Sequence, residues 1–93
     1  MRGVVFPGNR KIEYLEVPDP TPGPLDVVIE MKASGMCGTD LQNYRRPLDQ
    51  PAYMPSLIGR PPIAGHEPAG IVCAVGSAVP AQLARVGQRV MVH

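Results

Sequence analysis

Two short turns of this sequence carry the side chains best suited to chemistry. Segment 35–40, Gly-Met-Cys-Gly-Thr-Asp, places a cysteine among small residues, and segment 65–70, Gly-His-Glu-Pro-Ala-Gly, places a histidine between a glycine and a carboxylate. Zinc binds thiolate sulfur at about 2.3 Å and imidazole nitrogen at about 2.0–2.1 Å. A thiolate and an imidazole from two separate turns can share one such ion, and we predict that Cys37 and His66 do so.

The same residues also have plainer structural interpretations. A lone cysteine is more often a small buried thiol, and a lone histidine is more often a hydrogen-bonded structural residue. Thr39 and Asp40 could cap a helix, which is compatible with a role at a pocket. Cys73 is expected in the core and His93 at the end of a strand. A zinc finger is set aside because no Cys-x₂₋₄-Cys or His-x₃₋₅-His spacing occurs.

Short strands must position these turns. Runs 2–6 and 11–17 flank Pro7-Gly8-Asn9, where Gly8 or Asn9 can take positive φ, and predict an N-terminal hairpin with Ile12 and Tyr14 on one face. Residues 26–34 alternate in polarity and predict a strand. Its apolar face is expected to comprise Val27, Ile29, Met31 and Ala33.

The rest of the chain predicts one short helix, a long loop and two more strands. A helix is expected from the Thr39-Asp40 cap through about Arg46, followed by a proline-rich loop over residues 47–62. Apolar runs over 69–75 and 89–92 predict strands. About five short strands with one helix indicate a mainly β fold, a small barrel or sandwich.

Composition limits the class of protein. Ninety-three residues make at most one small domain, and a net charge of +1 without a basic run argues against nucleic acid as a partner. The pair Arg45-Arg46 is interpreted as a solvated face. No secretory signal or membrane-length apolar stretch is present. Two distant cysteines fit reduced thiols, so we expect a soluble, cytoplasmic protein without a membrane partner.

Three motifs together resemble the zinc-containing medium-chain alcohol dehydrogenases. Gly65-His66-Glu67 with Gly70, Gly76 and Val79 matches the signature Gly-His-Glu-x₂-Gly-x₅-Gly-x₂-Val without a gap. Segment 35–40 resembles that family's first zinc-ligand turn, and segment 86–90, Val-Gly-Gln-Arg-Val, resembles its Val-Gly-Asp-Arg-Val strand with Gln for Asp. The resemblance covers residues 1–93. It implies the N-terminal part of a GroES-like catalytic domain, a partly open β-barrel with one short helix.

The resemblance also implies roles for individual residues. Cys37 and His66 would be two ligands of the catalytic zinc, and Glu67 would lie close to the metal and could exchange with water as a ligand. Thr39 would accept the proton of the substrate alcohol, and Asp40 would fix the imidazole of His66. An intact protein would oxidise an alcohol or polyol, or reduce the matching carbonyl, with NAD or NADP as the cofactor.

Several features of that family are missing from the sequence. No third zinc ligand, four-cysteine zinc loop or Gly-x-Gly-x-x-Gly follows, so we expect a truncation before a dinucleotide-binding (Rossmann) domain. An intact protein could form homo-oligomers. Two alternatives stay open: a non-catalytic GroES-like barrel module, and a zinc-free quinone reductase of the same superfamily. The latter would need neither Cys37 nor His66.

We predict that the isolated 93-residue chain does not turn over alcohols. The chain lacks a pyrophosphate-binding loop, and its two expected ligands are fewer than the three protein ligands of catalytic zinc. The measurement is NAD reduction by the purified chain supplied with zinc and an alcohol. Alcohol-dependent reduction above a blank of zinc alone would contradict the prediction.

Overall fold

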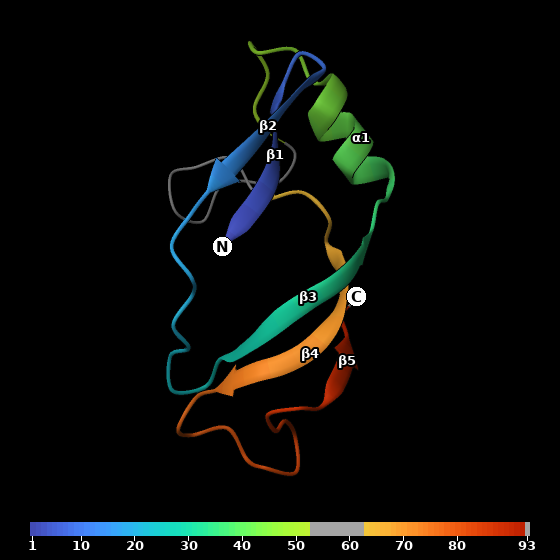
Figure 1. The fold of residues 1–93 in the computed structure, drawn as a ribbon. Helices are drawn as coiled ribbons and strands as arrows, with labels where there is room; N and C mark the ends of the chain where they lie inside the picture. Colours follow the sequence, from blue (N-terminus) through green and yellow to red (C-terminus); the bar gives the residue numbers. More distant parts are fainter. Residues whose placement is uncertain (53–62, 93) are drawn as a thin grey trace. The chain divides into compact units, whose positions relative to one another are not determined.

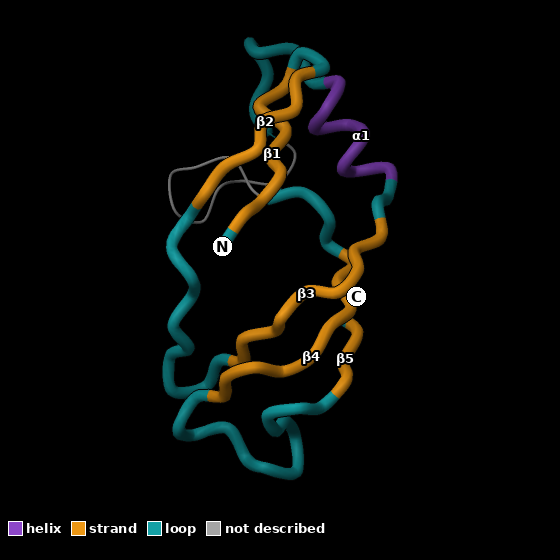
Figure 2. Tube along the Cα trace, viewed as in Figure 1, coloured by secondary structure: helices purple, strands orange, loops and turns teal. Residues whose placement is uncertain are grey.

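The computed structural model describes residues 1–52 and 63–92. The chain divides into two compact units. The hairpin unit comprises Met1–Pro18 and Met36–Gly65, and the sheet unit comprises Asp19–Gly35 and His66–His93. The described residues contain five strands and one helix, which Figure 2 separates from the loops. The mainly β class predicted from the sequence is therefore confirmed.

An antiparallel hairpin opens the first unit. Strand β1 (Arg2–Gly8) pairs with β2 (Lys11–Glu16) through a two-residue turn at Asn9 and Arg10, both with positive φ. Turns with two left-handed residues match the right-handed twist of the strands they join. The predicted hairpin is confirmed, but Pro7 and Gly8 belong to β1 and not to the turn. A register irregularity between Val5 and Gly8 accommodates the proline, which cannot donate to the ladder.

Helix α1 (Gly38–Arg45) packs beside β1 in the same unit (Figure 1). The rings of Phe6 and Tyr44 meet edge to face with centroids 5.8 Å apart. The hairpin turn also satisfies carbonyls at the end of the helix, because Asn9 N donates to Arg46 O and Arg10 N to Tyr44 O, both at 2.7 Å. The helix therefore ends against the hairpin turn.

The sheet unit contains three antiparallel strands. Strand β3 (Val27–Gly35) pairs with β4 (Glu67–Val75), and β4 pairs with β5 (Arg89–Met91), so the order is β3-β4-β5 (Figure 1). Strand β4 begins two residues before its predicted start. The strands of the described residues form two sheets and no closed barrel.

Two irregularities between β3 and β4 change which side chains are covered. The pairing skips Cys73 on β4 and Lys32 on β3. Such bulges reverse the strict alternation of faces. Val72 is buried, but Cys73 is exposed, so its predicted core position is wrong. The predicted apolar face of β3 is largely uncovered: Ile29 is half-buried, and its other members are exposed, namely Val27, Met31 and Ala33.

Two glycines of the Gly-His-Glu signature lie where backbones approach closely. A Cβ on Gly70 would overlap the carbonyl oxygen of Glu30 on the neighbouring strand. A Cβ on Gly76 would overlap the carbonyl oxygens of Gly23 and Pro24. Both positions therefore require glycine for packing within the sheet unit.

Other expectations have mixed outcomes. The predicted loop over 47–62 is described for residues 47–52, which form no helix or strand, whereas residues 53–62 and His93 lie outside the described part. Ile12 and Tyr14 are both well exposed. Within the described residues, no helix is long and apolar enough to cross a bilayer.

We predict that Gly70→Ala destabilises the sheet unit. The added Cβ must displace β3, and overpacking of this kind costs about 1–3 kcal/mol of unfolding free energy. Gly38→Ala is the matched control, because nothing lies within 4 Å of a Cβ there and alanine favours a helix. Urea unfolding measures both. Equal midpoints for the two variants would contradict the prediction.

Candidate metal-binding turns

The turn before α1 presents the sulfur of Cys37 to the backbone and side chain of Thr39. Cys37 has extended backbone and is the N-cap of the helix. Thr39 N donates to Cys37 Sγ at 3.4 Å, and Thr39 Oγ1 lies 3.0 Å from the same sulfur. The amide of Thr39 thus donates to this sulfur at the N-terminus of α1, and the thiolate is the form of cysteine that binds metals. The side chain is half-buried, so the sulfur is not sealed in a core.

Asp40 joins two turns within the hairpin unit. Its side chain is 3% exposed, and its two oxygens accept different backbone amides. Oδ2 accepts from Cys37 N at 3.0 Å, and Oδ1 accepts from Gly65 N at 3.2 Å. Gly65 has φ of 88°, a conformation that favours glycine. One carboxylate thus fixes the backbone of Cys37 and that of the residue before His66.

The helix cap differs from the prediction. Cys37, and neither Thr39 nor Asp40, is the N-cap residue. Asp40 occupies the third helical position and completes a capping box by binding the amide of Cys37. The difference arises because sulfur takes the acceptor role that serine or threonine oxygen usually fills.

The sheet unit holds the second turn where β4 begins. Glu67 pairs with Gly35, the last residue of β3. The Glu67 side chain lies directly over Gly35, because a Cβ on Gly35 would overlap its carboxylate. His66 is half-buried, and Glu67 is exposed. The hairpin unit therefore gathers Cys37, Thr39 and Asp40, and the sheet unit carries His66 and Glu67 side by side in sequence.

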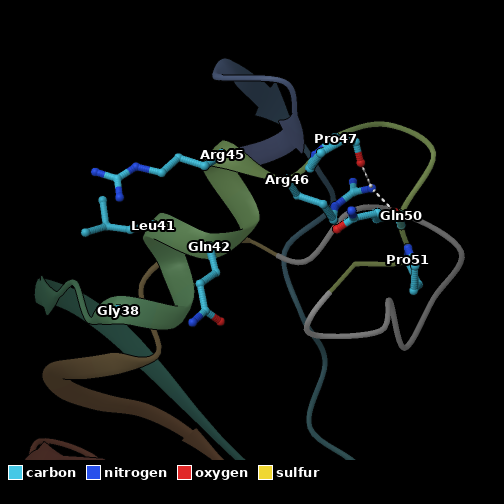
Figure 3. Close-up of a pocket in the computed structure, with 8 residues that line it drawn as sticks. All are labelled: Gly38, Leu41, Gln42, Arg45, Arg46, Pro47, Gln50 and Pro51. Atoms are coloured by element: carbon cyan, nitrogen blue, oxygen red, sulfur yellow. Dashed lines mark hydrogen bonds between the residues drawn. The ribbon is translucent and has the colours of Figure 1, made fainter.

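A hollow of about 550 Å³ lies along α1 in the hairpin unit. Its lining includes Gly38, Leu41, Gln42, Arg45, Arg46 and Gln50 (Figure 3). No sequence pattern indicates this hollow, because an exposed helical face and a following loop have no distinctive spacing. The adjacent arginines were the only signal.

Arg46 has a role that the sequence interpretation missed. A solvated position is confirmed for Arg45, which is exposed, but is wrong for Arg46, which is half-buried. Arg46 Nη2 donates to Pro7 O at 2.7 Å, and Nη1 donates to the carbonyls of Gln50 and Pro47 (Figure 3). This guanidinium holds β1 and the start of the loop together at the end of α1.

Comparison with known proteins identifies what the fold is similar to. Residues 23–93 match the alcohol dehydrogenase GroES-like domain. An L-threonine 3-dehydrogenase of Saccharopolyspora erythraea is 44% identical over 69 residues, which are 73% of this chain and 19% of that protein. The chain spans about a fifth to a quarter of the length of the curated relatives it matches.

Two solved structures share the fold. The 2R,3R-butanediol dehydrogenase of Bacillus subtilis has a TM-score of 0.78 at 30% identity, over 98% of this chain and 27% of that one. A quinone oxidoreductase of Pseudomonas syringae pv. tomato has a TM-score of 0.73 at 30% identity, over 97% of this chain and 26% of that one. The predicted GroES-like fold is therefore confirmed as a partial one.

We predict that Asp40→Ala lowers the unfolding free energy by about 2–4 kcal/mol, because two amides lose the acceptor that a nearly buried carboxylate provides. Asp49→Ala, at an exposed position, is the control and should change stability by no more than about 0.5 kcal/mol. Chemical denaturation gives both values. A loss no larger for Asp40→Ala than for Asp49→Ala would show that the two bonds do not stabilise the fold.

Proposed function

The chain belongs to the alcohol dehydrogenase GroES-like domain family, as the N-terminal part of a medium-chain alcohol dehydrogenase, and on that premise we propose that it supplies the metal-binding turns of a zinc-dependent alcohol or polyol dehydrogenase. One observation carries the proposal. The carboxylate of Asp40 binds the amide of Cys37 and the amide of Gly65, to which His66 is joined by a peptide bond.

The donor chemistry of the two turns fits zinc. Cys37, His66 and Glu67 offer a sulfur, an imidazole nitrogen and a carboxylate oxygen, all of which zinc accepts. The amide of Thr39 donates to Cys37 Sγ, the atom that such a site requires as a thiolate. We assign Cys37 and His66 as ligands and Glu67 as a carboxylate that exchanges with water. A bound zinc ion would act as a Lewis acid that stabilises an alkoxide.

Thr39 and Asp40 complete the proposed proton path and support. Thr39 Oγ1 lies 3.0 Å from the sulfur of Cys37, so its hydroxyl is beside the assigned ligand atom. It would accept the proton of the substrate hydroxyl and pass it to solvent. Asp40 would hold the ligand turns and the His66 imidazole in place. Bound NAD or NADP would supply the hydride acceptor for the oxidation of the alcohol to a carbonyl.

A zinc-free quinone reductase is the second candidate. The similarity to a quinone oxidoreductase at 30% identity favours it. Such an enzyme would have no use for a thiolate at Cys37 or an imidazole at His66, and neither would a non-catalytic barrel module. Metal binding therefore separates the first proposal from both alternatives. Neither Cys37 nor Cys73 forms a disulfide within the described residues, which suits the cytoplasmic location that we propose.

We expect the chain to bind Co²⁺, a spectroscopic substitute for zinc, through Cys37. The wild-type chain should show a sulfur-to-cobalt charge-transfer absorption that Cys37→Ser abolishes. Cys73→Ser is the matched control and should keep the absorption, because Cys73 lies in an exposed bulge of the sheet unit. The measurement is a cobalt titration followed by absorption spectroscopy, with circular dichroism to verify that each variant is folded.

The titration can refute the proposal directly. Absence of the charge-transfer absorption from a folded wild-type chain at saturating cobalt would favour the zinc-free candidates. Loss of the absorption in Cys73→Ser with retention in Cys37→Ser would show that the wrong thiolate was assigned.

A further inference from the structure

The hollow along α1 begins beside the turn that carries Cys37. Gly38, the residue after Cys37, lines it, and nothing lies within 4 Å of where a Cβ on Gly38 would be. The lining continues along the helix through Leu41 to Arg45. Seven residues of helix rise by about 10 Å. The hollow thus extends about 10 Å along the helix from the proposed metal-binding turn.

The charged residues that line the hollow are all positive. Its described lining contains two arginines, Arg45 and Arg46, and no aspartate or glutamate. The sequence between Gln50 and His66 also contains no acidic residue. Because the whole chain has a net charge of only +1, two positive charges in one hollow are a local concentration. A hollow lined by one sign of charge attracts ligands of the opposite sign.

The two arginines differ in what they can bind. Arg46 is held by the carbonyls of Pro7, Pro47 and Gln50, none of which neutralises its charge. Arg45 is exposed, and among the described residues it has no acidic partner. Figure 3 shows Leu41 and Arg45 projecting from the same side of α1, whereas Arg46 turns toward Pro47 and Gln50. Arg45 therefore has donors available for a ligand, and Arg46 adds a fixed positive charge nearby.

We infer that the substrate of this site is an anionic alcohol, whose carboxylate or phosphate binds Arg45 while its hydroxyl lies at the turn of Cys37 and Thr39. The inference deepens the proposed function and rests on it. The uncharged part of the substrate would lie against Leu41, which is 40% exposed. Arginine suits this role because its guanidinium matches the geometry of carboxylate and phosphate oxygens.

The test is a titration of the metal-free chain, followed by amide chemical shifts of α1 in nuclear magnetic resonance spectra. Two pairs of ligands each compare an anionic alcohol with a neutral alcohol of the same carbon skeleton. They are 4-hydroxybutyrate with butane-1,4-diol, and glycerol 3-phosphate with glycerol. We expect saturable shifts at Gly38, Leu41 and Arg45 with at least one anion and none with either diol or glycerol. Comparison of the affinities of the two anions shows whether the site prefers carboxylate or phosphate.

Substitutions then assign the anion to Arg45. Arg45→Gln should weaken the binding by about tenfold or more, as expected for the loss of one charge-assisted contact. Arg85→Gln removes an exposed arginine of the sheet unit and should leave the affinity unchanged. Equal affinity for the wild-type and Arg45→Gln chains, or equal shifts with the neutral partners, would overturn the inference. Shifts with pyrophosphate alone would also overturn it, because the hollow would then accept a cofactor and not a substrate.

Failure of this inference can be told from failure of the proposed function. Anion binding is measured with a chelator present, whereas the proposed function is tested by cobalt absorption. Cobalt binding without anion binding would leave a dehydrogenase site for a neutral alcohol. Anion binding without cobalt absorption would remove the metal site, and with it the assignment of the anion as a dehydrogenase substrate.

Discussion

The paired hydrogen bonds of Asp40 are the interaction on which the candidate site depends. This carboxylate is nearly buried, and both of its oxygens are occupied by amides from segments 25 or more residues apart in sequence. A buried carboxylate is costly unless its oxygens are satisfied, so the two turns and the side chain stabilise one another. Asp40 also occupies the first turn of α1, where the helix dipole favours a negative charge.

Local patterns predicted most of the elements correctly. The Pro7-Gly8-Asn9 cluster identified the hairpin because positive φ is a property of single residues. The bounds of α1 were predicted to within one residue at each end, although its N-cap is Cys37 and neither Thr39 nor Asp40. The faces of β3 and β4 could not be predicted, since the skipped residues Lys32 and Cys73 depend on how two distant strands pair. Alternation within one strand contains no information about such a skip.

The two turns of the candidate site were predicted from the sequence, but the contacts that hold them were not. Motif resemblance identified the two turns, and the family and the fold are confirmed. The contact of Asp40 with the amide of Gly65 could not be inferred, because it joins a side-chain oxygen to a distant backbone amide whose position no residue type specifies. The ligand role of Cys37 and His66 stays a prediction. Arg46 was misjudged because a charged residue beside another charged residue suggests solvent, whereas its carbonyl partners lie in β1 and the following loop.

The contact between the hairpin turn and the end of α1 has a consequence for how the chain folds. A helix of eight residues is too short to persist alone in water, since its nucleation costs more than so few internal bonds return. Amides of Asn9 and Arg10 bind carbonyls that such a helix leaves unsatisfied, so the helix and the hairpin form cooperatively. The organisation of the cysteine at the opposite end of α1 is therefore coupled to closure of the turn in the first ten residues. A variant that lacks residues 1–10 would therefore present an unstructured thiol in place of a preformed ligand.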